Sequence, residues 1–266
     1  MLTGLQQLNV ELTSRCSKKT VCACCGHQDR KTNPNLKFGD IDFALLEKIR
    51  AQVEPGIIIS CHRDGDSLDY PQIEEALTLF DGFAISLVTH GERLNERAKY
   101  IIGNCTTVTV SIVPKDPDRA IQLESIRGFL AQKGDHAPMC QLKFVGHIEN
   151  PEEYEALGVP IINRALHSKK GDWNYVRAEP PIPEIRVCLD FLSRPTVDWR
   201  GNFYACNRLD PNDDGLLGNL NVSTLDDLWN GPVRAKMMKA HLAGRRDLAG
   251  GLCSKCEFYG IPTPAG

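Results

Sequence analysis

Short apolar runs recur along the first part of the chain, and each is separated from the next by a segment with helical spacing. Between residue 5 and about residue 163, the runs fall at residues 5–12, 56–61, 83–88, 106–112, 141–145 and 159–162. Such runs, rich in β-branched side chains and bounded by breaks such as Pro55-Gly56, are typical of buried strands. The pattern therefore predicts a series of short strands.

The segments between these runs have the spacing of helices. Ile41, Leu45, Ile49 and Val53 repeat every four residues, as one apolar face of a helix does. Pro71 stands near the first turn of a helix expected over residues 70–79, and more helices are expected over residues 94–102, 117–132 and 152–157. Such alternation predicts an α/β fold with a parallel sheet and right-handed crossovers. An open six-strand barrel and a doubly wound sheet both fit, and in either the active site lies at the carboxyl ends of the strands.

The alternation stops after the last of these runs. Residues 164–187 are rich in Pro, Lys and Arg and are interpreted as a connector, and residues 196–205 suggest a hairpin that turns at Arg200-Gly201-Asn202. Ser223-Thr224-Leu225-Asp226 resembles a capping box that opens a helix through Trp229, and Pro232 opens another through Leu242. This tail is small enough that a bound metal cluster would help to stabilise it.

Charge and composition exclude several classes of protein. Among 266 residues, 31 Lys and Arg face 34 Asp and Glu, so no basic surplus points to a nucleic acid or another polyanion. The N-terminus lacks the charged and apolar blocks of a signal peptide, and the apolar runs are too short to span a bilayer. We therefore expect a soluble cytoplasmic protein.

Cysteine is the unusual component, with 11 residues. In a reducing compartment, clustered cysteines more often bind metal or perform redox chemistry than form disulfides. One group lies near the start of the chain, one lies in the last third, and three cysteines stand alone in or beside apolar runs, where core packing is expected. The three sets are Cys16, Cys22, Cys24 and Cys25; Cys188, Cys206, Cys253 and Cys256; and Cys61, Cys105 and Cys140.

The first group follows the first predicted strand. Three thiolates on one loop suit an iron–sulfur cluster that keeps one iron open for a ligand from outside the protein. A zinc site built from Cys22 and Cys25 with another pair is the alternative.

Here the sequence resembles the radical S-adenosylmethionine superfamily. That family has a CxxxCxxC motif after its first strand, preceded by a phrase much like Leu12-Thr13-Ser14-Arg15-Cys16. In this chain five residues separate the first two cysteines, a spacing found in a minority of the family, and Cys24 stands where an aromatic residue is usual. The resemblance implies Cys16, Cys22 and Cys25 as ligands of a 4Fe–4S cluster, with Cys24 as a possible replacement for Cys25.

The resemblance also implies contacts with S-adenosylmethionine at later strand ends. Gly65-Asp66 stands where the family meets the methionine amino group, and Thr89-His90 resembles a second family motif. Ser111 corresponds to a ribose contact and Val145 to the neighbourhood of the adenine. A plain turn at Gly65-Asp66 and a capped strand end at Ser111 are the alternatives.

The implied chemistry is radical. A reduced 4Fe–4S cluster, supplied with electrons by a flavodoxin- or ferredoxin-type donor, cleaves S-adenosylmethionine, and the 5′-deoxyadenosyl radical removes a hydrogen atom from the substrate. The resemblance selects the partial (β/α)6 TIM-type barrel over the doubly wound sheet.

The four tail cysteines allow either zinc or an iron–sulfur cluster by spacing alone. The order Cys188, Asp198 to Cys206, Leu217-Gly218-Asn219-Leu220, Cys253 and Cys256 resembles the SPASM and twitch extensions of the same superfamily. Four cysteines correspond to the shorter twitch form with one auxiliary 4Fe–4S cluster, as in aminocyclitol dehydrogenases of the butirosin type. We therefore expect a radical S-adenosylmethionine barrel over residues 1–165, a connector over 166–186 and a twitch domain over 187–266.

A cluster ligated by four cysteines has no open iron, so an electron-transfer role is expected for it. The favoured function is oxidation of a small alcohol- or amine-bearing metabolite, with Arg164, His167 and Lys169 as candidates for assisting proton loss; a solvated basic connector is the alternative for these three.

A radical isomerase, epimerase or bond-forming enzyme acting on a peptide or nucleotide is the second hypothesis. The early start of the first strand leaves no N-terminal peptide-recognition domain, which favours a small substrate. A zinc-stabilised binding protein is the third hypothesis.

Overall fold

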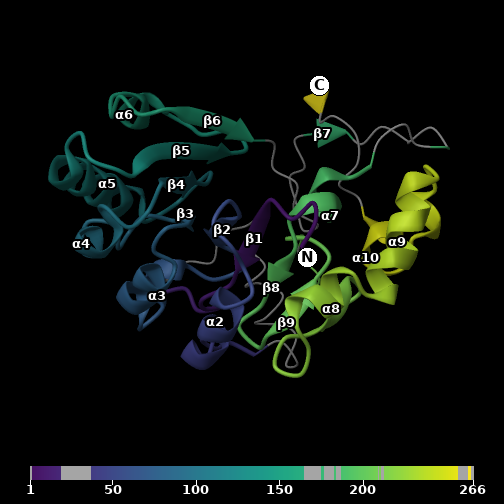
Figure 1. The fold of residues 1–266 in the computed structure, drawn as a ribbon. Coiled ribbons are helices and arrows are strands. Elements are labelled where there is room, and N and C mark those ends of the chain that lie inside the picture. The colour runs from purple at the N-terminus through teal and green to yellow at the C-terminus, as the bar shows by residue number, and fades with distance from the viewer. Residues whose placement is uncertain are drawn as a thin grey trace.

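A computed structural model describes residues 2–18, 37–164, 175–176, 183, 187–208, 210, 213–256 and 263–264. Within these residues the chain has two regions: a sheet with helices on one face, and a tail that carries the last four helices (Figure 1).

The strands are short, and most of them belong to the first region. They are β1 (Gln7–Val10), β2 (Ile58–Cys61), β3 (Ala84–Thr89), β4 (Thr107–Ile112), β5 (Met139–Val145), β6 (Ile161–Arg164), β7 (Tyr175–Val176), β8 (Thr196–Val197), β9 (Asn202–Tyr204), β10 (Leu216–Asn219) and β11 (Thr263–Pro264). The helices are α2 (Phe43–Arg50), α3 (Ile73–Leu79), α4 (Ala98–Ile101), α5 (Arg119–Lys133), α6 (Glu152–Glu155), α7 (Leu189–Ser193), α8 (Leu225–Trp229), α9 (Pro232–Leu242) and α10 (Gly251–Lys255), with 3₁₀ helices at Ser67–Asp69 and Arg246–Leu248.

One sheet of nine strands runs through the described residues in the order β10-β9-β8-β1-β2-β3-β4-β5-β6. Neighbouring strands from β1 to β6 are all parallel, as the alternation of runs and helices predicts. The sheet stays open, with β6 and β10 at its two edges. The α/β fold with an open, partial barrel is therefore confirmed.

Two local predictions differ from the structure in detail. The helix expected over residues 70–79 begins later, at Ile73, because Tyr70 precedes Pro71 and is extended (ψ 125°). The capping box lies one residue later than expected. Thr224 is the N-cap, and the carboxylate of Asp227, not of Asp226, accepts a hydrogen bond from the backbone N–H of Thr224. The helix opened by Pro232 ends at Leu242, as predicted.

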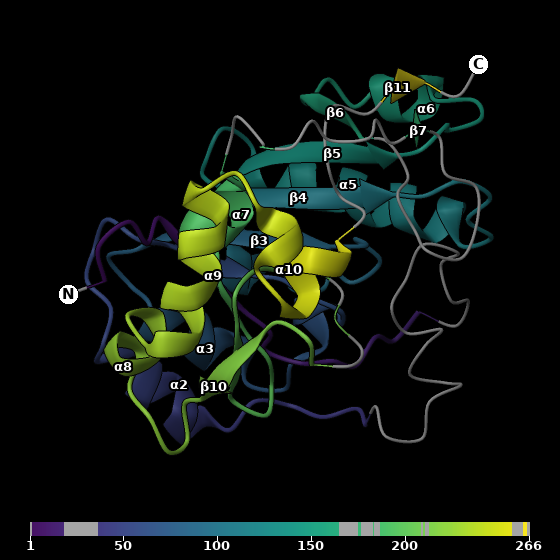
Figure 2. The same ribbon diagram turned by 90° about the vertical axis from the view of Figure 1, so that its right-hand side faces the viewer.

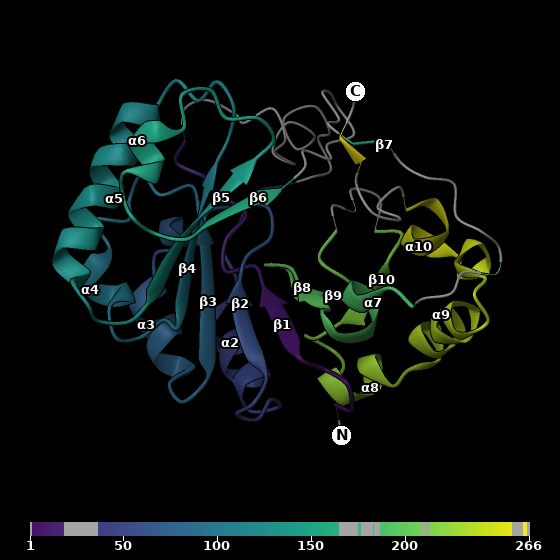
Figure 3. The ribbon, with the colours of Figure 1, turned by 90° about the horizontal axis from the view of Figure 1, so that it is seen from above.

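The helices cover only one face of the parallel sheet. Figure 3 shows α3 to α6 along the outer face of the strands, with the tail on the other side of β1. The outward-pointing strand residues are apolar and buried, among them Leu8, Ile59, Leu87, Val108 and Leu142. No helix in the described residues is long and apolar enough to cross a membrane.

The tail is joined to the barrel through β1. Strand β8 pairs with β1 in parallel, and the Asn9 side-chain amide donates to the carbonyl of Pro195 over 3.0 Å. β8 and β9 form the predicted antiparallel hairpin, whose turn uses Gly201 at a φ of +84°. From the tail side, α9 and α10 lie in front of the sheet (Figure 2).

Trp229 holds the tail helices against the start of the chain. Its side chain is 1% exposed, its indole N–H donates to the carbonyl of Thr3 over 3.0 Å, and the guanidinium of Arg234 lies 3.4 Å from its ring centroid. We therefore expect Trp229→Ala to lower the free energy of unfolding by about 3–5 kcal/mol through loss of buried area and a cavity. Urea titration monitored by circular dichroism measures this loss.

Leu242→Ala is the matched control, since Leu242 lies on the neighbouring helix but is 70% exposed. Equal losses for the two variants would contradict the anchoring role of Trp229.

Candidate functional site

The uncovered face of the parallel sheet is polar. Because side chains alternate along a strand, the residues between the buried apolar ones point to this inner face. The strand register aligns Asn9 with Ser60, and Ser60 with Ser86, across β1, β2 and β3. One step further, Thr109 aligns with Gln141, whose amide donates to the Thr109 hydroxyl over 2.8 Å. A polar face on a sheet with helices on only one side is suited to bind a polar ligand.

Three of the predicted site residues share this inner face. Ser111 lies beside Lys143 in the register of β4 and β5, and Val145 lies beside Arg164 in that of β5 and β6. The structure therefore brings Ser111, Val145 and Arg164 to one end of neighbouring strands. Their contacts with a cofactor or substrate stay predictions.

The loop after β1 is held tightly against the loop after β2. The backbone N–H of Asp66 donates to the carbonyl of Arg15 over 2.8 Å. A Cβ atom at Gly65 would lie 2.2 Å from the carbonyl oxygen of Thr13, so only glycine fits there. This contact places Cys16 at the carboxyl end of β1, next to the end of β2.

Asp66 joins the ends of β2 and β3. Its carboxylate is 4% exposed and accepts hydrogen bonds from the Thr89 hydroxyl at 2.7 Å, from the backbone N–H of His90 at 2.8 Å and from the backbone N–H of Leu68 at 2.9 Å. The structure thus brings together Gly65, Asp66, Thr89 and His90, and it shows that this carboxylate organises the loops. Whether it also meets the methionine amino group stays a prediction.

Cys16 faces two possible metal ligands. One ligand atom from each of Cys16, Asp69 and His90 lies within 4.8 Å of the others. However, Asp69 already accepts from the Ser17 backbone N–H at 2.5 Å and pairs with Arg93 at 2.8 Å, and His90 Nε2 lies 3.2 Å from Asp66. The Asp69 carboxylate is therefore already engaged by Ser17 and Arg93, which weakens it as a metal ligand. The predicted ligands Cys22 and Cys25, and the alternative Cys24, lie outside the described residues.

Lys18 anchors the start of the same loop to the far side of the site. Its side chain is 3% exposed, and its ammonium lies 2.6 Å from Glu92, 2.8 Å from Asp116 and 3.4 Å from Asp118. Burial disfavours the charged amine, but hydrogen bonds to Asp116 and Glu92 outweigh it and raise the pKa of Lys18. The segment after Cys16 is therefore tied to the ends of β3 and β4.

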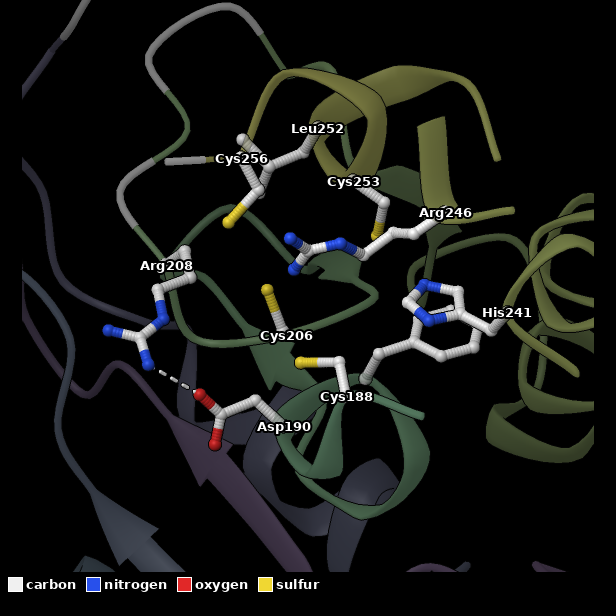
Figure 4. A pocket seen from close by; sticks show the side chains of 10 residues that line it. Cys188, Asp190, Cys206, Arg208, His241, Arg246, Leu252, Cys253 and Cys256 are labelled. Atoms are coloured by element: carbon white, nitrogen blue, oxygen red, sulfur yellow. Dashed lines mark hydrogen bonds and ion pairs between the residues drawn. The ribbon is translucent and has the colours of Figure 1, made fainter. Parts of the chain in front are cut away.

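The four tail cysteines meet in one pocket. Cys188 is the N-cap of α7, Cys206 follows β9, Cys253 lies in α10 and Cys256 caps its end. Figure 4 shows their sulfur atoms facing the same space. A set of four sulfur donors fits a tetrahedral metal or an iron–sulfur cluster.

The electrostatics of this pocket favour metal-bound thiolates over free ones. Burial raises the pKa of the Cys253 thiol to about 12, and the neighbouring Cys188 and Cys256 add to the shift. Burial likewise raises the pKa of Cys206. Without a metal the Cys206 and Cys253 thiols stay protonated at neutral pH, so metal binding there would displace their protons.

Three basic residues that the sequence did not single out, Arg208, His241 and Arg246, also line this pocket. Arg246 is 6% exposed, and His241 is 3% exposed and stacks on Phe191 with ring centroids 4.3 Å apart. Burial, followed by the charge of Arg246, lowers the pKa of His241 to about 4. For His241 and Arg246 the one signal in the sequence is their position shortly before Cys253, on or just after the helix opened by Pro232.

Arg164 ends β6, close enough to the four-cysteine pocket for two of its lining residues to influence the pKa of Arg164. Burial lowers its pKa, the nearby Arg208 lowers it further, and Asp190 opposes both. Asp190 and Arg208 pair over 2.7 Å and line the pocket (Figure 4). His167 and Lys169, the other two basic candidates, lie outside the described residues.

His62 is a site residue that the sequence reasoning missed. It directly follows β2, is half-buried, and has its pKa lowered to about 4 by burial and then by Lys143, while Asp64 raises it and Arg164 lowers it. Because this pKa lies well below 7, the imidazole is neutral at neutral pH and can accept a hydrogen bond. Its place at a strand end was the available signal.

The isolated cysteines are core residues, as expected. Cys61, Cys105 and Cys140 are 2–3% exposed, and burial raises the pKa of Cys61 to about 12 and that of Cys140 to about 11. They point toward the helices and not toward the inner face.

Comparisons with known proteins agree with this picture. Residues 188–257 match SPASM, an iron–sulfur cluster-binding domain, and this range contains all four tail cysteines. No curated protein matches the sequence.

Several solved structures share the fold. BtrN in complex with AdoMet and 2-DOIA is similar with a TM-score of 0.62 and 17% identity over 92% of this chain and 91% of that chain. SuiB from Streptococcus suis, bound to the precursor peptide SuiA, gives a TM-score of 0.60 and 12% identity over 95% and 71%. The enzyme anSMEcpe with bound AdoMet gives 0.62 and 14% over 89% and 83%. These likenesses confirm the fold that the sequence resemblance implied.

The buried Lys18 gives a test of how the first site is held. Lys18→Met leaves Asp116 and its neighbours clustered without their cation, so we expect the free energy of unfolding to fall by about 3–5 kcal/mol. Chemical denaturation monitored by fluorescence measures the change.

Lys115→Met is the control, because Lys115 is exposed at the same end of the sheet. We expect it to change the stability by less than about 0.5 kcal/mol. A Lys18 variant as stable as the Lys115 variant would refute the anchoring role.

Proposed function

We propose that this chain is a radical S-adenosylmethionine enzyme with an auxiliary iron–sulfur cluster. The observation that carries the proposal is a pocket of four cysteines in the SPASM-matching tail, joined to an open parallel sheet whose first strand leads to Cys16. When bound, a 4Fe–4S cluster and S-adenosylmethionine supply a 5′-deoxyadenosyl radical that removes a hydrogen atom from the substrate.

The residues divide between two sites. Cys16, Cys22 and Cys25 would hold the first cluster, and Cys188, Cys206, Cys253 and Cys256 the auxiliary one. S-adenosylmethionine would meet the loops built by Gly65, Asp66, Thr89 and His90, and then Ser111 and Val145 on the inner face. The bonds of Asp66 to both loops keep this surface in place before the ligand arrives.

We propose oxidation of a small alcohol or amine as the net reaction. Oxidation requires the loss of a proton and of a second electron after the hydrogen atom is removed. Arg164, His167 and Lys169 are the candidates for assisting proton loss, and the neutral His62, near Lys143 and Arg164, would accept a hydrogen bond from the substrate. The second electron would pass to the auxiliary cluster in the four-cysteine pocket. The ion pair Asp190–Arg208 lines this pocket and influences the pKa of Arg164, so the proton and electron acceptors would lie near each other.

Modification of a peptide or nucleotide is the second candidate. SuiB, whose structure contains a precursor peptide, is as similar in fold to this chain as BtrN is. Deuterium transfer from labelled candidates into 5′-deoxyadenosine distinguishes the two kinds of substrate.

The physiological setting follows from the same chemistry. We propose a cytoplasmic enzyme that receives electrons from a flavodoxin- or ferredoxin-type protein, since cysteines that bind iron–sulfur clusters are typical of a reducing compartment. We also propose the division into a barrel over residues 1–165, a connector over 166–186 and a twitch domain over 187–266.

Metal content tests the class of protein. After anaerobic reconstitution we expect about eight irons with matching sulfide, because each of two 4Fe–4S clusters holds four. Cys16→Ala should lose about half of the iron and all reductive cleavage of S-adenosylmethionine, measured as 5′-deoxyadenosine by chromatography. Stoichiometric zinc without sulfide would instead identify a zinc-stabilised binding protein.

Loss of the auxiliary cluster should separate cleavage from oxidation. Cys253→Ala removes one of its four ligands, so we expect 5′-deoxyadenosine to form at a reduced rate while oxidised product disappears. Mass spectrometry of both products measures the ratio. Cys140→Ala, which changes a buried core cysteine outside both sites, is the control. Unchanged product formation by the Cys253 variant would rule out the auxiliary cluster as electron acceptor.

A further inference from the structure

His241 occupies an unusual position in the four-cysteine pocket. It lies near the end of α9, is 3% exposed and lines the pocket together with the four sulfur atoms. Figure 4 shows the imidazole beside the sulfur atoms, between Cys188 and Arg246. No part of the function proposed above uses this side chain.

Both ring nitrogens of His241 lack a hydrogen-bond partner within the part of the chain that is described. An imidazole carries at least one N–H in either protonation state, and a buried donor without an acceptor costs about 1–3 kcal/mol. Native proteins rarely leave such a group unsatisfied unless a ligand completes it.

The orientation of the ring is fixed by packing. His241 stacks on Phe191 with ring planes only 5° apart, and Phe191 lies on the helix that Cys188 caps. Arg234 also lies over the Phe191 ring and donates to the carbonyls of Trp229 and Leu192. The plane of the imidazole is therefore fixed by its stacking on a packed aromatic ring.

We propose that His241 donates an N–H···S hydrogen bond to the auxiliary cluster and raises its reduction potential. This inference rests on the proposed function, which places a 4Fe–4S cluster on the four cysteines. Bound thiolates and sulfides supply the sulfur acceptors that the imidazole lacks. Reduction adds an electron to the cluster, and a hydrogen bond to sulfur stabilises the more negative state. The hydrogen bond from His241 thus makes the cluster a better electron acceptor.

The test uses the Cys16→Ala protein, in which the auxiliary cluster is the one expected to remain. His241→Phe keeps a ring to stack on Phe191 but removes both nitrogens. We expect the equilibrium constant for one-electron reduction to fall about tenfold, which is a drop of about 59 mV in midpoint potential. Redox titration monitored by electron paramagnetic resonance measures it. His136→Phe, the same change at an exposed histidine, should leave the potential unchanged.

Iron and sulfide content separates the two possible failures. Protein without about four irons and matching sulfide would overturn the auxiliary cluster itself. Protein with a full cluster and an unchanged potential in His241→Phe would overturn only the role of His241.

A second measurement covers a His241 variant that does not fold. In wild-type protein with ¹⁵N-labelled histidine, electron–nuclear double resonance of the reduced auxiliary cluster should show a ¹⁵N coupling and an exchangeable deuteron coupling in D₂O. Absence of both couplings would refute the hydrogen bond.

Discussion

Strand β1 is hydrogen-bonded on both edges, and both candidate sites depend on this pairing. One edge pairs with β2 of the parallel barrel, and the other pairs with β8 of the tail. The side chain of Asn9 strengthens the second contact by donating to Pro195. Because Cys16 follows β1 and Cys206 follows the β8–β9 hairpin, the shared strand relates the two sites directly. Backbone ladders are among the stiffest connections in a protein, so the distance between the sites is built into the sheet.

The two faces of the sheet have different roles because their side chains differ. Parallel sheets are commonly covered by helices on both faces. Here the outer face is apolar and packs under helices, whereas the inner face carries Ser60, Thr109 and Gln141. Gln141 donates to Thr109 on this face, and polar groups that no helix covers can also bind a polar ligand. The same alternation that stabilises the barrel therefore also prepares a polar surface for a substrate.

Buried polar contacts then hold the site loops in one arrangement. Asp66 joins the ends of β2 and β3, while Lys18 draws the segment after Cys16 toward β3 and β4. Asp66 and Lys18 are both buried, where an unpaired charge would be costly, so few other conformations of these loops are stable. In the tail, the stacking of His241 on Phe191 fixes a side chain that lines the four-cysteine pocket. Both candidate sites are thus organised by residues other than the cysteines proposed as metal ligands.

The sequence alone determined the strands and helices, the parallel order and the grouping of the tail cysteines, because periodicity and turn residues act over a few neighbours. It also placed Ser111 and Val145 at strand ends that the register brings to one face. The sequence did not reveal that β8 joins β1, or that His62, His241 and Lys18 belong to the sites. Those features arise between residues far apart in the chain: Asn9 and Pro195 meet across 186 positions. Only tertiary packing decides which distant edges and side chains meet, because many pairings satisfy the same local pattern.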